Sequence, residues 1–62
     1  MNANEFVDLV LTKKFESIKE MEQFYNEMCS KFDSMRNEDK EKIKSSMCLE
    51  MLDRAIKKVG FG

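Results

Sequence analysis

The two cysteines, Cys29 and Cys48, are the side chains of this 62-residue chain best suited to nucleophilic or metal chemistry. The chain contains no histidine, so neither thiol has the usual base that would convert it to a thiolate. Two cysteines without histidine also cannot complete a zinc site. We therefore expect no metal. One disulfide between the two cysteines is an open alternative, but the favoured interpretation makes both of them small buried hydrophobic residues.

A second candidate for chemistry is the serine pair Ser45 and Ser46, which stands close to Lys42 and Lys44. Nucleophilic serines are presented on a sharp glycine turn beside an oxyanion loop, whereas both glycines of this chain lie near its C-terminal end. A glycine-rich loop for phosphate is missing for the same reason. The sequence therefore indicates a protein that is not an enzyme, with no catalytic residue, no cofactor and no small-molecule substrate.

The composition is that of a small and nearly neutral domain. Eleven Lys and Arg residues stand against twelve Asp and Glu residues, without the basic patch that nucleic-acid binders show. No apolar stretch approaches the roughly 20 residues that cross a bilayer, and the N-terminal region lacks the pattern of an export signal. These features predict a cytoplasmic protein without membrane contact, and they disfavour nucleic acid as a partner.

Two capping boxes predict where the first two helices begin. In this motif a polar side chain and an acidic one, three residues apart, bond the free N–H groups of the first turn. The two boxes are Asn2 with Glu5 and Ser17 with Glu20. They predict helices over residues 3–13 and 18–35, which we expect to pack as a hairpin around Phe15.

A third helix is expected over residues 38–59. Asn37 is a suitable N-cap, and Gly60 suits a left-handed C-terminal cap. In that cap the side chain of Phe61 would contact Ile56. With no proline and no glycine inside this segment, nothing predicts an interruption.

The expected fold is an all-α three-helix bundle formed by a single domain, residues 1–62. A core of this size rarely supplies more than about 3–5 kcal/mol of net stability. Small proteins usually gain the rest from disulfides, a metal or association, and here association is the route left open. We therefore expect a homodimer that self-associates through the second and third helices.

Large apolar residues recur at alternating steps of three and four along the second helix, the spacing of a packed seam. This seam consists of Ile18, Met21, Tyr25, Met28, Phe32 and Met35. One interpretation makes it the core face of the bundle. The other makes part of it a protein-binding surface, because methionine and aromatic residues dominate where leucine and isoleucine would specify a core more sharply.

The two halves of the expected third helix differ. Its first half carries Ile43 as the only large apolar residue, and apolar residues dominate from Met47 onward. At 100° per residue, Lys40 and Lys44 lie on the same side as Met47 and Met51. We therefore expect the first two turns to project beyond the bundle. The two lysines are either solvated or rim charges of a binding surface.

These patterns predict a non-enzymatic protein-interaction module, in the form of a small inhibitor or modulator of a larger regulatory or host protein. A phage-like accessory protein is one such form. The expected partner-binding residues are Met21, Tyr25, Met28, Phe32, Met35, Met47, Met51, Lys40 and Lys44. Two alternatives stay open: a dimeric DNA- or RNA-associated regulator, whose binding would weaken with salt, and a structural subunit of a larger assembly.

Overall fold

Four helices make up the computed structural model, which describes the chain from Met1 to Phe61, with side chains as far as Val59. The helices are α1 (Ala3–Thr12), α2 (Ile18–Asp33), α3 (Asn37–Ser46) and α4 (Cys48–Phe61). No strand occurs in this described part. The all-α prediction is confirmed. The three-helix prediction is wrong in one respect, because the expected third helix is two helices.

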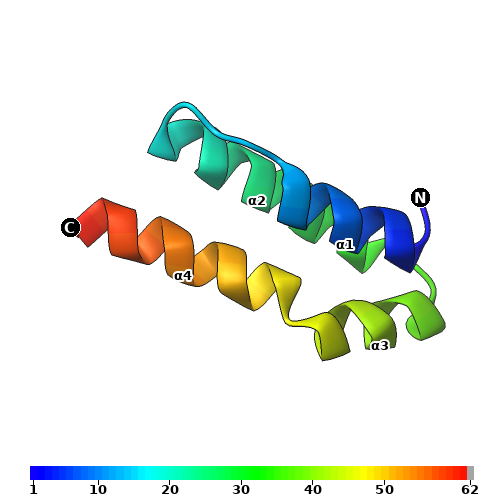
Figure 1. Ribbon diagram of the computed structural model, residues 1–62. Helices are drawn as coiled ribbons and strands as arrows, with labels where there is room; N and C mark the ends of the chain where they lie inside the picture. Colours follow the sequence, from blue (N-terminus) through cyan, green and yellow to red (C-terminus); the bar gives the residue numbers. More distant parts are fainter. Residues whose placement is uncertain (62) are drawn as a thin grey trace.

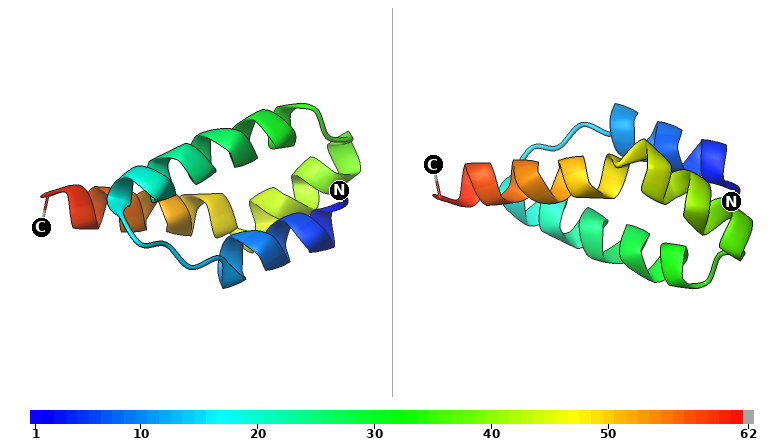
Figure 2. Two further views of the ribbon diagram at one scale, coloured as in Figure 1. Left: turned by 90° about the horizontal axis from the view of Figure 1, so that it is seen from above. Right: turned by 90° about the horizontal axis from the view of Figure 1, so that it is seen from below.

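The helices form two layers in an elongated molecule of 35 × 18 × 17 Å. Helices α1 and α2 run antiparallel in one layer, and α3 and α4 follow one another in the second layer (Figure 1). The main contacts join α2 to α4 and α1 to α3, so the expected packing of the first two helices against each other as a hairpin is wrong. Seen from above or below, α4 lies between α1 and α2 (Figure 2). The Phe15 ring packs 5.4 Å from the Phe24 ring and fixes the connection between α1 and α2.

The first two helices begin as their capping residues predict. The Asn2 side-chain oxygen accepts a hydrogen bond from the Glu5 N–H at 2.9 Å, and the Ser17 hydroxyl accepts one from the Glu20 N–H at 3.2 Å. The return bond of the second box differs from the prediction. A capping box predicts that the Glu20 carboxylate accepts from the N–H of Ser17, but it accepts from the N–H of Glu16 at 2.7 Å instead.

Helix α3 begins differently from the prediction. Its N-cap is Arg36, which has extended backbone and makes no side-chain capping bond. Asn37 is the first residue inside the helix, because the carbonyl of Arg36 already accepts the N–H of Lys40 at 2.9 Å. The predicted capping role of Asn37 is therefore wrong. The carboxylates of Glu38 and Asp39 lie in the first turn, where they complement the helix dipole.

The far end of α4 also differs from the prediction. The helix continues through Gly60 to Phe61, so the expected end at residue 59 is wrong. The carboxylate of Asp53 and the ammonium of Lys57 form an ion pair at 3.0 Å along this helix. The expected contact between Phe61 and Ile56 falls outside the described side chains.

The expected third helix is interrupted at Met47, whose backbone is left-handed, with φ 60° and ψ 19°. The hydroxyl of Ser46 supports the interruption from both sides. It donates to the carbonyl of Ile43 at 2.6 Å and accepts from the N–H of Cys48 at 3.3 Å. Such local side-chain bonds compete with helix continuation, and hydrophobic periodicity does not show them.

The interruption decides which side chains of α3 and α4 reach the core. In one continuous helix Ile43 and Cys48 would point about 140° apart, toward different parts of the molecule. Across the left-handed residue both are buried, with exposed fractions of 1% and 0%. Helix α3 therefore packs against α1, and the prediction that its first two turns project beyond the bundle is wrong.

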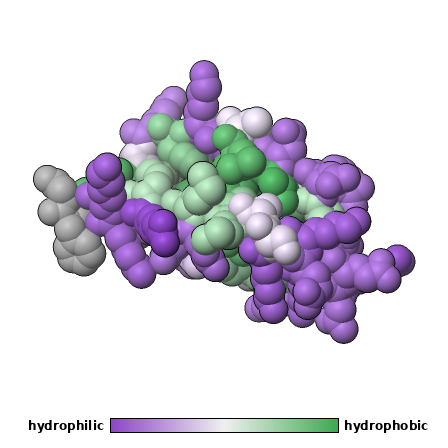
Figure 3. Space-filling view, turned by 60° about the horizontal axis from the view of Figure 1, so that its bottom comes forward, coloured by the Kyte–Doolittle hydropathy of each residue, from purple (hydrophilic) through white to green (hydrophobic). Residues whose placement is uncertain are grey.

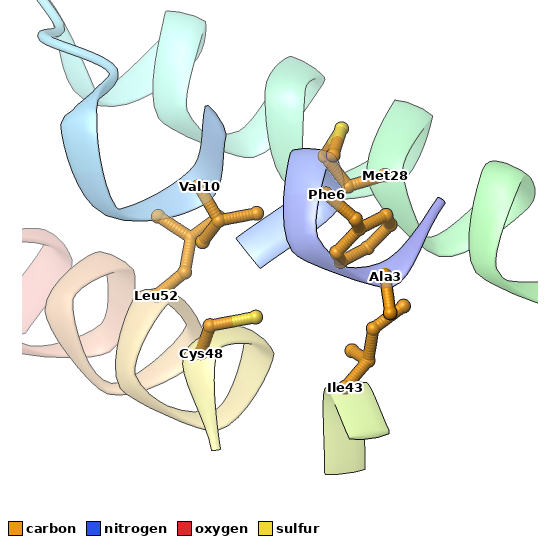
Figure 4. Close-up of a cluster of buried hydrophobic side chains, with 7 residues drawn as sticks. All are labelled: Ala3, Phe6, Val10, Met28, Ile43, Cys48 and Leu52. Carbon is orange, nitrogen blue, oxygen red and sulfur yellow. The ribbon is translucent and has the colours of Figure 1, made fainter. Parts of the chain in front are cut away.

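One cluster of buried side chains holds the helices together (Figure 4). Its members are Ala3, Phe6, Val10, Met28, Ile43, Cys48 and Leu52. Phe6 is fully buried, and its ring lies 6.5 Å from the Phe32 ring of α2. Both cysteines are free thiols. The prediction of burial is confirmed for Cys48 and wrong for Cys29, which is half-buried.

Replacing Met47 with glycine is expected to raise the free energy of unfolding by about 0.5–1 kcal/mol. Glycine adopts left-handed backbone readily, whereas other residues lose about 1 kcal/mol or more there. Urea unfolding followed by circular dichroism measures the change. Met51→Gly is the matched control, because the same substitution inside α4 should lower stability by about 1 kcal/mol. Similar losses in both variants would contradict the left-handed backbone at Met47.

Candidate functional site

A hollow of about 210 Å³ opens where α2, α3 and α4 meet. It is lined by Phe32, Ile43, Lys44, Met47, Leu49 and Glu50. Ile43 is almost fully buried, while Met47 keeps an exposed fraction of 46%. The helix interruption creates the hollow, because α3 and α4 each contribute residues that a continuous helix would direct elsewhere.

The hollow combines apolar walls with opposite charges at its edge. Phe32 and Leu49 are half-buried, and the charged residues Lys44 and Glu50 are exposed. The ammonium of Lys40 lies 5.8 Å from the centroid of the Phe32 ring, within the range of a cation–π contact that helps hold the ring in place.

The size of the hollow indicates what it can bind. Pockets for drug-sized molecules and cofactors usually measure about 300–1,000 Å³, so this hollow is smaller. Its volume is closer to that of a single large apolar side chain. Anchors of this kind, seated in apolar pockets, carry most of the energy of many protein interfaces.

The seam of the second helix faces the core of its own chain. Met28 has an exposed fraction of 1%, so no partner can contact it without opening the fold. Four others are half-buried and pack against the same core: Met21, Tyr25, Phe32 and Met35. The sixth, Ile18, is also half-buried. Within the seam, only Phe32 also lines the hollow.

The structure brings four of the expected partner-binding residues together at the hollow. Phe32, Lys44 and Met47 line it, and Lys40 contacts the ring of Phe32. Met51 is also exposed, at 54%, but it is not among the lining residues. The expected stripe from the two lysines to both methionines is therefore divided by the interruption at Met47.

Sequence reasoning missed three residues of the hollow: Ile43, Leu49 and Glu50. Ile43 stands out in the sequence as the lone large apolar residue of residues 38–46. It gave no indication of a site, because its contact with α4 residues depends on the interruption. The double serine that precedes Met47 is the one signal that could have indicated this interruption.

Tyr25 is the titratable group whose environment is most altered. Burial raises its pKa, and a side-chain hydrogen bond with Cys29 and the nearby charges of Cys29 and Asp53 act in the same direction. A phenol held in its neutral form does not serve as a general base near neutral pH. Tyr25 is half-buried and packs against the core cluster.

This raised pKa predicts that the free energy of unfolding falls as the pH rises above 10, and that Tyr25→Phe removes this part of the pH dependence. The folded-state pKa lies above the ordinary value of 10.0, so folding favours the protonated phenol. That contribution is complete below pH 10 and disappears as the pH rises through the folded-state value. The measurement is the free energy of unfolding of both proteins between about pH 9 and pH 11. An identical pH dependence for the two proteins would contradict the prediction.

Two wider hollows, of about 540 and 470 Å³, are lined mostly by polar and charged residues. Within the described residues, no three His, Cys, Asp or Glu side chains come together as a metal site, and none of the described helices is both long and apolar enough to span a membrane. No family model, no curated protein and no solved structure matches this chain. The hollow is the candidate site by its geometry and chemistry alone.

Proposed function

We propose that this chain is a non-enzymatic protein-interaction module that inhibits or modulates a larger protein. The partner inserts one large apolar side chain into the hollow between α2, α3 and α4. The observation that carries the proposal is Met47, an apolar side chain that stays 46% exposed on left-handed backbone. Strained backbone of this kind gathers at functional sites, and exposed apolar surface beside a hollow favours binding.

Binding at this site has a simple physical basis. Each Å² of apolar surface removed from water contributes about 25 cal/mol, and the flexible side chain of Met47 can adapt to the shape of the inserted residue. Lys44 and Glu50 present opposite charges beside the hollow. These charges orient the partner and speed its encounter more than they add affinity. Both cysteines are free, which fits the reducing conditions of the cytoplasm, where we place the interaction.

Capture with a variant that removes the exposed methionine tests the proposal. Met47→Asn deletes the apolar side chain, and asparagine tolerates left-handed backbone, so the variant should stay folded. Wild-type and variant chains are tagged, and proteins captured from the native cells are quantified by mass spectrometry. We expect at least one protein to be captured at least tenfold less by Met47→Asn, the loss typical of a central anchor.

Met51→Gln is the matched control. It changes another exposed methionine of similar size that does not line the hollow, and glutamine is a good helix former. The captured protein should be retained fully by this variant. Equal capture by all three folded chains would show that the hollow does not bind the partner.

A further inference from the structure

We propose that a second copy of this chain binds across the exposed face between α1 and α4, forming a weak two-fold dimer. This face carries an apolar patch, the α1–α4 patch, made of Val7, Leu11, Met51 and Ala55. Leu11 and Met51 have exposed fractions of 56% and 54%, and Val7 and Ala55 are half-buried. The patch does not involve the seam of α2, which faces the core.

Helix geometry places these four residues on one side of the molecule. Val10 of α1 and Leu52 of α4 face each other in the core (Figure 4), and the two helices run in the same direction (Figure 1). Because both helices are right-handed and parallel, the residue that follows Val10 and the residue that precedes Leu52 point to the same side of the helix pair. Leu11 and Met51 occupy these two positions.

The remaining patch residues follow from the same geometry. Val7 lies about 60° from Val10 on the side of Leu11, and Ala55 lies about 60° from Leu52 on the side of Met51. A view with the α3–α4 layer turned forward shows apolar surface gathered in the middle of this side, with hydrophilic surface toward both ends (Figure 3).

The two ends of the patch carry opposite charge: one is mainly acidic and the other is basic. At one end, Asp8 and Glu41 line a groove with Val7 and Leu11; Lys42 lies there too, so two carboxylates stand against one ammonium. At the other end, Lys14 follows α1 and Lys58 lies in the last turn of α4. Both lysines are exposed.

This distribution fits a second copy of the same chain better than an unrelated partner. In a two-fold interface the acidic end of one copy meets the basic end of the other, and the reverse contact forms as well. The apolar residues then meet at the centre. The patch has four residues, two of them half-buried, whereas a stable complex uses roughly 20–30 residues a side. The dimer should therefore form only at high protein concentration.

Sedimentation velocity from about 10 µM to about 1 mM tests the dimer. The wild-type chain should pass from monomer to dimer within this range. An acidic-end variant, Asp8→Lys with Glu41→Lys, and a basic-end variant, Lys14→Glu with Lys58→Glu, should each raise the dissociation constant at least tenfold, because like charges then meet. An equimolar mixture of the two variants should form a heterodimer at least as tight as the wild-type dimer. That rescue would show that the charged ends of one copy contact those of the other.

Two methionine variants separate this dimer from partner binding at the hollow. Met51→Gln should weaken the dimer at least tenfold and leave partner capture unchanged, whereas Met47→Asn should do the opposite. Circular dichroism verifies that each variant is folded. A wild-type chain that remains monomeric at about 1 mM, or a dimer that none of the patch variants weakens, overturns the inference. Neither result bears on the hollow.

Discussion

Phe6→Ala is expected to leave most of the chain unfolded at room temperature. Phe6 is fully buried in the cluster between the two layers, and truncating a buried phenylalanine costs about 3–5 kcal/mol. A core of this size supplies about the same net stability. Alanine is the best helix former, so the loss comes from packing alone. Urea unfolding of both proteins, followed by circular dichroism, measures the difference.

Leu11→Ala is the control for this prediction. Leu11 belongs to the same helix and is also a large apolar residue, but more than half of its surface is exposed. In dilute solution, where the proposed dimer dissociates, its truncation should change stability by no more than about 0.5 kcal/mol. Comparable losses for the two variants would show that Phe6 does not hold the core as the structure places it.

Ile43→Ala is expected to release α3 while the other helices stay folded. Ile43 is the only buried side chain of this helix, and truncating a buried isoleucine costs about 2–5 kcal/mol. The remaining residues of α3 are mostly charged or polar, so little else holds it to α1. Hydrogen exchange should show lost protection of the amides from residues 40–46 and retained protection in α2 and α4.

Lys42→Ala provides the comparison within the same helix. Its side chain is exposed, and alanine favours the helix, so protection of the α3 amides should be unchanged or stronger. If Ile43→Ala instead lowered protection equally in all four helices, α3 would unfold only together with the whole domain. The local anchoring by Ile43 would then be wrong.

The starts of the first two helices were predictable because their determinants are local. Asn2 and Ser17 bond N–H groups three residues ahead, so the relevant partners are adjacent in the sequence. The buried state of Cys48 was predictable for a different reason. A thiol without histidine or metal partners in the chain behaves as a small apolar side chain.

The break at Met47 was not predictable from periodicity. A helical wheel assumes one continuous phase over residues 38–59, and a single left-handed residue changes that phase for everything after it. The sequence predicts Lys44 and Met47 as site residues because they lie on one stripe of a continuous helix. The interruption divides that stripe, so it is not a single surface. Lys44 and Met47 meet at the hollow through the interruption, together with Leu49, which the stripe did not include.

The seam of α2 illustrates a second limit of sequence patterns. Spacing shows that Met28 and Phe32 lie on one face of a helix, but it does not show which molecule covers that face. Here the same chain covers it, because Phe6 from α1 and Leu52 from α4 share a cluster with Met28. Tertiary packing therefore decides between core and interface.

The different burial of the two thiols allows the opening rate of the domain to be measured by thiol alkylation. Cys29 is half-buried and Cys48 is fully enclosed, so a thiol-alkylating reagent can reach the second sulfur only while the domain is open. The proportion of doubly alkylated chains over time, measured by mass spectrometry, then reports how often the native state opens.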